Sequence, residues 1–349
     1  MSSVRSKQAG FSLIELMIAL VIGLILVAGV LQVFVGSTIT YSMQSGLSKI
    51  QENGRFAISF LSRDIRQAGF TGCSRNATLV NTLTRDASGA VPSFLDMNNV
   101  LSGRNDMDGS ESYAQVPLAG TDVVEVRFAD PVGACDIDNH DKGSERISCA
   151  LDHTFQQGEI LVATDCSHTA VFQFATVGAS DQIFHGVDNS VLPGNCTDGL
   201  GDPVDCSNSA GIDYEYRNGS VMRMRAYRYY VANTSRGEPS LYRETISTSA
   251  SGASGTVAQE LVEGVEDMQI LYGEDTNNDD SADYYVPFDQ VADSDDVVSV
   301  RVSLLIRSIE DTLVEGGQSL RFNGAIMIPP PDGRLRKVFT STIALRNRL

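Results

Sequence analysis

The residues best suited to metal chemistry lie between Asp275 and Asp283, where oxygen-bearing side chains recur at alternate positions. Those side chains belong to Asp275, Asn277, Asp279 and Asp283. Such a loop can surround one hard cation with about six to eight oxygens, as Ca²⁺ prefers. However, Asp280 stands where an EF-hand loop needs Gly, and Val286 stands where it has a bidentate Glu. Two interpretations stay open, a calcium site and a solvated acidic turn.

Cysteines provide a second kind of chemistry, and all of them follow residue 70. They are Cys73, Cys135, Cys149, Cys166, Cys196 and Cys206. An even number in an exported domain predicts up to three disulfides. Cys135 and Cys149 bracket one polar loop and Cys196 and Cys206 another, so these two local pairs are predicted. The alternative is free buried cysteines. Without a Cys-x-x-Cys motif, zinc-ribbon and thioredoxin-like sites are disfavoured.

Catalytic patterns are absent from the sequence. It contains no HExxH, P-loop, GxSxG or dinucleotide fingerprint. The four histidines, His140, His153, His168 and His185, are scattered. We expect His140 and His153 in solvent-facing loops and His185 inside the fold. The sequence therefore predicts a protein that is not an enzyme.

A single carboxylate, Glu15, opens a long uncharged segment near the N-terminus. No residue from Leu16 to Ser48 is charged, and the 20 residues from Leu16 to Val35 are almost wholly apolar. That length suits a helix crossing a hydrocarbon core of ~30 Å. Because Arg5 and Lys7 precede the segment, we expect the N-terminus in the cytoplasm and the remainder outside it.

Neither a signal peptide nor a plain membrane anchor accounts for this segment. The apolar run is too long for a signal peptide, and no small-residue cleavage site follows it. An anchor does not explain Glu15, since a carboxylate at a helix centre costs ~2.5–3.5 kcal/mol on insertion scales. Glu15 lies near the end of the span, so facing the headgroups is the alternative to a specific partner.

The run Gly10-Phe11-Ser12-Leu13-Ile14-Glu15-Leu16-Met17, with its basic leader, is similar to the prepilin motif of type IV pilins and type II secretion pseudopilins. The resemblance implies that residues 1–10 are a leader and that a prepilin peptidase cuts between Gly10 and Phe11. It also implies N-methylation of Phe11. A free amine at Phe11 would need a carboxylate partner inside an apolar fibre, and Glu15 of a neighbouring subunit could supply it.

The C-terminal part resembles the PilW type of minor pilin and, less specifically, the J-type minor pseudopilin of type II secretion. The resemblance is carried by residues 296–308, 336–339 and 345–348. It implies a role in pilus assembly, including priming and a tip complex with other minor pilins, the major pilin and a large adhesin. It places the chain in the inner membrane, with its domain in the periplasm, and then at the fibre tip.

The expected fold is α+β and type IV pilin-like. Apolar residues at steps of three and four predict one helix over 11–69, with a transmembrane half at about 14–36, while Asp64 is placed on a face other than the apolar one. Residues 70–120 are predicted as an irregular connection and 121–349 as a β-rich domain. Alternating patterns there predict an antiparallel sheet packed on the second half of the helix. Residues 258–268 fit either a short helix or a strand.

Two other functions stay open. A type II secretion minor pseudopilin fits the same motifs, and a pilin-anchored adhesin or binding module would need a ligand site in 70–120 or 188–213. The net charge of −18 argues against nucleic acid as a partner, because that requires a basic surface. No cofactor is predicted other than calcium.

Overall fold

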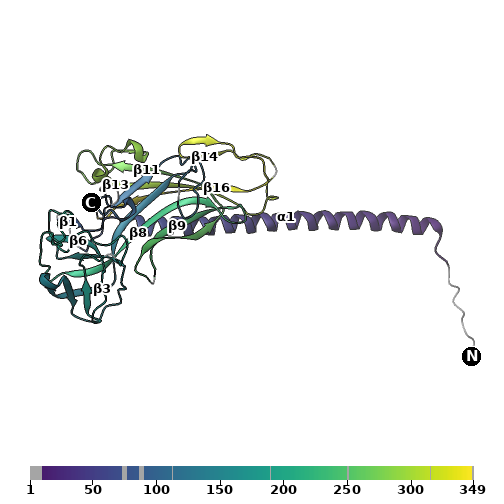
Figure 1. The fold of residues 1–349 in the computed structure, drawn as a ribbon. Coiled ribbons are helices and arrows are strands. Elements are labelled where there is room, and N and C mark those ends of the chain that lie inside the picture. The colour runs from purple at the N-terminus through teal and green to yellow at the C-terminus, as the bar shows by residue number, and fades with distance from the viewer. Residues whose placement is uncertain are drawn as a thin grey trace, which may run out of the picture.

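The computed structural model describes residues 10–72, 77–85, 90–111, 113–188, 190–249, 251–314 and 316–347. One long helix, α1 (Leu13–Ile65), projects from a β-rich domain, as Figure 1 shows. The remaining regular structure consists mostly of antiparallel strands. The predicted α+β class with a long N-terminal helix is confirmed.

The ends of α1 follow from local chemistry. Ser12 caps the first turn with its side chain, and no proline interrupts the helix. After Ile65 the chain continues as a turn to Gly69, which has a φ of +78°, and the Gly69 N–H donates to the carbonyl of Arg127 at 2.9 Å. Since glycine tolerates this left-handed conformation, the change of direction occurs there.

The larger sheet has ten strands in the order β1-β6-β5-β8-β3-β4-β7, with β2 on β3 and with β9 and β10 continuing from β8. Its strands are β1 (Thr78–Asn81), β2 (Leu101–Arg104), β3 (Val123–Asp141), β4 (Arg146–Cys149), β5 (Ile160–Thr164), β6 (His168–Gln173), β7 (Gln182–Phe184), β8 (Ser220–Asn233), β9 (Pro239–Thr248) and β10 (Ser254–Glu263). The β1–β6 pair is parallel, and the other pairs are antiparallel.

A smaller sheet lies against α1 and has the order β12-β11-β13-β16. Its strands are β11 (Val265–Glu274), β12 (Tyr284–Val286), β13 (Val297–Arg307) and β16 (Arg336–Ala344), and a separate hairpin pairs β14 (Leu320–Phe322) with β15 (Ala325–Met327). Valine and leucine side chains of β13 pack in one core with Ile50, Leu61 and Ile65 of α1. The second half of the helix is therefore part of the domain core.

One segment contains more regular structure than expected, and in a second the structure decides between two open alternatives. The stretch 70–120 contains β1 and β2, which the polar composition concealed. It is fixed by Arg127, which is 1% exposed and donates to the carbonyls of Phe94 and Asn99 at 3.1 and 2.5 Å. Residues 258–268 are extended rather than helical, because β10 and β11 meet at Gly264, whose φ is +86°.

Candidate functional site

The N-terminal end of α1 presents the residues that the sequence singled out. Phe11 is 90% exposed, and Gly10 precedes it outside the helix. The structure places Glu15 in the first helical turn, three residues after Ser12. The three sites predicted for processing and assembly, Gly10, Phe11 and Glu15, therefore lie next to one another in the chain where α1 begins.

Glu15 and Ser12 form a reciprocal capping box. The Ser12 hydroxyl accepts a hydrogen bond from the Glu15 N–H at 3.2 Å, while Oε2 of Glu15 accepts from the Ser12 N–H at 2.9 Å. The Ser12 hydroxyl also donates to this oxygen at 3.0 Å. The Ser-x-x-Glu spacing of a capping box would have revealed this pairing in the sequence. The box holds the Glu15 carboxylate beside the chain end.

Residues 13–44 of α1 project beyond the domain, a distance of about 48 Å at the helical rise. Almost every side chain along this part is exposed, including large apolar residues such as Leu24, Ile25 and Phe34. α1 is long enough and apolar enough to cross a membrane. Outside a membrane, this surface would require other apolar surfaces to cover it.

The domain begins to cover α1 at Gly46. A Cβ built at Gly46 would lie 2.3 Å from Leu313, and one at Gly54 would lie 2.4 Å from the ring of Phe339. Two glycines eight residues apart thus let the segment after β13 and strand β16 approach the helix closely. Lys49 adds an exposed ion pair with Glu310 at 2.7 Å.

A charged cluster joins the end of α1 to the larger sheet. Asp64 is 1% exposed, accepts from Nε of Arg63 at 2.8 Å, and lies 3.3 Å from Nη1 of Arg243. The hydroxyl of Tyr229 also donates to it. Asp64, which was expected away from the apolar face, is therefore buried as well, and partners from β8 and β9 compensate its charge.

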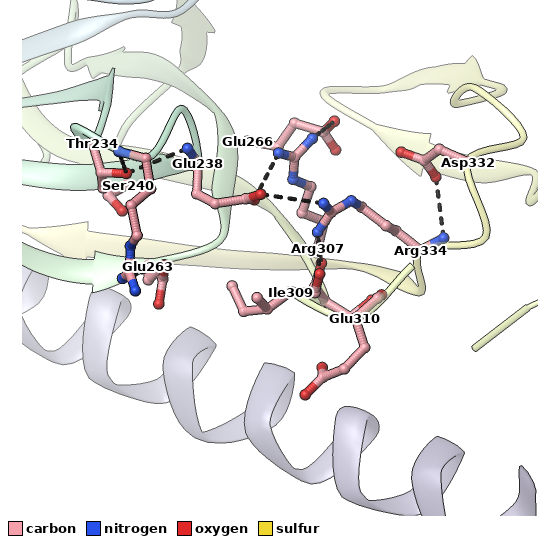
Figure 2. A network of polar contacts seen from close by, with 12 residues as sticks. Thr234, Glu238, Ser240, Glu263, Glu266, Arg307, Ile309, Glu310, Asp332 and Arg334 are labelled. Atoms are coloured by element: carbon pink, nitrogen blue, oxygen red, sulfur yellow. Dashed lines mark hydrogen bonds and ion pairs between the residues drawn. The ribbon is translucent and has the colours of Figure 1, made fainter. Parts of the chain in front are cut away.

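A second network fixes the segment between β13 and β16 to the sheet, as Figure 2 shows. Glu238 lies 2.9 Å from Nη2 of Arg307 and 3.2 Å from Nη2 of Arg334. Arg336 pairs with Glu266 at 2.6 Å and with Asp332 at 2.7 Å. Hydrogen bonding to Arg336 holds the pKa of Asp332 well below its usual range. This network holds in place the segment between β13 and β16, which covers α1 near the point where the helix leaves the domain.

Two of the predicted disulfides are present. Cys135 is bonded to Cys149 and Cys196 to Cys206. Cys166 is also disulfide-bonded, while Cys73 lies outside the described residues. The first bridge links the paired strands β3 and β4, and the second closes a polar loop of the domain. Both pairings agree with their prediction.

Two histidines form a buried pair that the sequence did not predict. Nε2 of His140 and Nε2 of His185 are 3.0 Å apart, and Nδ1 of His140 accepts the Tyr216 N–H at 3.1 Å. Burial lowers the pKa of His140 to about 4, and burial together with His140 lowers that of His185 to about 3. The expectation that His140 lies in a solvent-facing loop is wrong, because it belongs to strand β3.

In the predicted calcium loop, two carboxylates accept hydrogen bonds from the loop itself. Asp275 accepts the N–H groups of Asn277, Asp279 and Asp280 at 3.1, 3.3 and 2.7 Å. Asp283 accepts from the side chain of Asn277 at 3.1 Å. Among the described residues, His, Cys, Asp and Glu side chains do not converge in groups of three or more that could hold a metal ion. The geometry is that of an acidic turn, and calcium binding stays a prediction.

Two family models match the chain, one towards each end. The prokaryotic N-terminal methylation motif matches residues 5–31, and Type IV Pilus-assembly protein W matches residues 228–347. No curated protein and no solved structure matches the chain significantly. The first match contains Gly10, Phe11 and Glu15, and the second contains β9 to β16, including the strands that cover α1. Together, the two matches make the chain similar to PilW-type minor pilins at both ends.

Proposed function

We propose that this protein is a minor pilin that primes assembly of a type IV pilus and occupies the tip complex of the fibre. The observation that carries the proposal is a processing motif followed by about 48 Å of uncovered apolar helix. The match to a pilus-assembly family supports it. In this role the protein is structural and carries out no catalysis.

The membrane span and the fibre core are two environments for the same surface. Before assembly the exposed part of α1 lies in the inner membrane, with the N-terminus in the cytoplasm and the domain in the periplasm. After assembly, helices of the other minor pilins and the major pilin cover that surface, as a large adhesin caps the complex. The support for this cycle is that residues 13–44 have almost no covering within the chain itself.

Cleavage after Gly10 by a prepilin peptidase creates a charged amine on Phe11, and N-methylation leaves it cationic. In a fibre core of low dielectric, that amine needs a carboxylate partner. We assign this role to Glu15 of the neighbouring subunit. The capping box uses Oε2 of Glu15, which keeps the carboxylate at the helix end where an incoming chain can reach it.

A deletion strain tests the proposed function when it is scored separately for surface pili and for exoprotein secretion. Loss of pili with normal secretion is expected. Loss of secretion with normal pili would instead assign the protein to a type II secretion pseudopilus. Normal pili with lost adhesion would identify a pilin-anchored binding module. Complementation with Gly10→Val is expected to fail because the peptidase site is blocked, whereas Gly29→Ala, inside the apolar helix, serves as the control.

A further inference from the structure

The hairpin of β14 and β15 carries large apolar side chains on its outer face. Ile326 and Ile328 are 77% and 74% exposed, whereas Phe322, which points to the other face, is 7% exposed. Ile326 lies opposite Arg321 in the strand register, so these side chains share one face, and Ile328 follows on that face two residues later. The two strands form a sheet of their own. The outer face of the hairpin is therefore open to a partner.

The hairpin lacks the acidic character of the rest of the chain. Residues 316–331 contain a single charged side chain, the exposed Arg321, in a chain whose net charge is −18. Arg321 forms no ion pair within the part of the chain that the structure describes. The carboxylate of Glu310, which precedes the hairpin, is paired with Lys49. Apolar side chains beside an unpaired basic one suit the boundary between headgroups and acyl chains of a bilayer, because anionic lipids attract the base.

The hairpin belongs to the segment that covers α1 where the helix leaves the domain. Leu313 of that segment packs against Gly46 of the helix. In Figure 1 the yellow segment between β13 and β16 is the part of the domain that reaches furthest along the projecting helix. The Arg336 N–H donates to Oε1 of Gln318 at 2.8 Å and so ties the start of the hairpin to β16. The hairpin therefore keeps a fixed position relative to α1.

The length of α1 between the expected membrane span and the domain decides whether lipid is within reach. Gly46 follows residue 36, the expected end of the span, by about 15 Å at the helical rise. The headgroup layer takes up about 5–7 Å of this distance. Transmembrane helices tilt by about 20° on average, which lowers one side of the domain towards the bilayer. The side that carries the hairpin is the one that extends along the helix and narrows the remaining gap.

We propose that the β14–β15 hairpin docks on the bilayer before assembly, with Ile326 and Ile328 at the boundary between headgroups and acyl chains and Arg321 among anionic headgroups. The inference rests on the membrane-anchored state of the proposed function and adds a second lipid contact to it. Two contacts fix the orientation of the domain on the membrane, whereas a single helix leaves the domain free to rotate. Entry of the subunit into the fibre then releases the hairpin as well as α1 from lipid.

The test uses the full chain in vesicles of phosphatidylethanolamine and phosphatidylglycerol, with and without brominated acyl chains that quench tryptophan. The chain has no Trp, so each substitution introduces a single reporter. Ile328→Trp is expected to show blue-shifted emission that the brominated lipid quenches. Leu151→Trp also replaces an exposed apolar residue, after β4, and is expected to stay unquenched. This control excludes attraction of the Trp ring itself to lipid as the cause.

A third reporter separates this inference from the proposed function. Ile25→Trp lies in the exposed apolar part of α1 and is expected to be quenched strongly. Quenching at Ile25→Trp without quenching at Ile328→Trp would overturn the docking of the hairpin and leave the membrane anchor intact. Absence of quenching at both positions would contradict the membrane-anchored state and the docking together.

A charge variant tests the lipid partner. In the Ile328→Trp chain, Arg321→Gln is expected to lower the ratio of docked to free hairpin about fivefold, the effect of one basic residue near an anionic surface. Arg66→Gln, the same change at an exposed position near the other end of α1, is the matched control and leaves the quenching unchanged. If Ile328→Trp stayed unquenched in vesicles while Ile328→Ser abolished pili, the hairpin would be a contact between subunits, and the proposal would fail.

Discussion

The hydroxyl of Tyr229 donates a hydrogen bond to Oδ2 of Asp64, and this contact joins strand β8 to the buried side of α1. Arg243 of β9 lies 3.3 Å from the same oxygen. The helix thus carries one buried charge in its last turns, and neighbouring strands of the larger sheet supply its partners. The cluster fixes both the rotation of α1 about its axis and its position along the sheet.

Removal of the Asp64 charge should release this contact. Asp64→Asn is expected to lower the free energy of unfolding by about 3 kcal/mol, because Arg243 would lose its buried partner. Tyr229→Phe is expected to cost about 1.5 kcal/mol, the value of a hydrogen bond to a charged group. Urea unfolding of the full chain in detergent measures both. Glu52→Gln, an exposed change on the same helix, should leave the urea midpoint unchanged. Equal effects of Asp64→Asn and Glu52→Gln would contradict a stabilising role of the Asp64 cluster.

Gly54 and Gly36 offer a matched pair of glycines within one helix. A Cβ at Gly54 would lie 2.4 Å from Phe339, whereas a Cβ at Gly36 meets nothing within 4 Å. We expect Gly54→Ala to destabilise the domain by about 1–3 kcal/mol through overpacking. Gly36→Ala should not destabilise it, since alanine favours a helix by up to about 1 kcal/mol over glycine. Thermal unfolding followed by circular dichroism would show whether the two variants separate.

The buried pair His140 and His185 predicts a loss of stability in mild acid. Both rings stay neutral in the fold, with pKa values of about 4 and about 3, while an unfolded histidine takes up a proton near pH 6.5. The unfolded state therefore binds more protons between these values, so stability falls as the pH drops from about 6.5 to about 4. From the shift of His140 alone the loss is about 3 kcal/mol.

Asp267 titrates in the same range with the opposite sign. Burial raises its pKa to about 6, so the folded state binds the extra proton and gains stability as the pH falls. The test therefore compares urea midpoints at pH 7.5 and 5.0 for the wild type and for a variant in which His140 and His185 are both Leu. The variant is expected to lose less stability on acidification than the wild type does. If the stability of the variant depended on pH as that of the wild type does, the histidines would not be the cause of the loss.

Glu15 should matter for assembly and not for folding. Its side chain contacts only the exposed turn at Ser12, so Glu15→Val is expected to leave the unfolding of the domain unchanged. Incorporation into fibres should fall strongly, because the amine of a neighbouring Phe11 would lose its partner. Ser12→Ala is the companion variant, since it removes the cap and retains the carboxylate. Sheared pili probed by immunoblot measure incorporation, and a normal yield with Glu15→Val would contradict the pairing.

The sequence revealed the projecting helix, most strands and two disulfides because each has a local signal. Periodicity marks α1 and β13, and polar loops bracketed by cysteines mark the bridges. Asp64, His140 and Arg127 could not be placed in this way. A buried polar residue is compensated by residues far away in the chain, so its own neighbourhood looks like that of an exposed one. The burial of Glu274 in β11 could not be predicted for the same reason. Its carboxylate accepts the N–H groups of Ala292 and Asp293, which follow only after β12.

The coverage of α1 has a consequence for the order in which the chain folds. The strands β13 and β16, which pack on the helix, follow it far along the chain, and the Asn347 side chain donates to the carbonyls of Gln67 and Ala68. The apolar side of residues 46–65 is therefore covered only after the residues up to β16 have been synthesised. Contacts so distant in sequence form slowly. We therefore expect a membrane surface or a holdase to shield the helix until β16 has been synthesised.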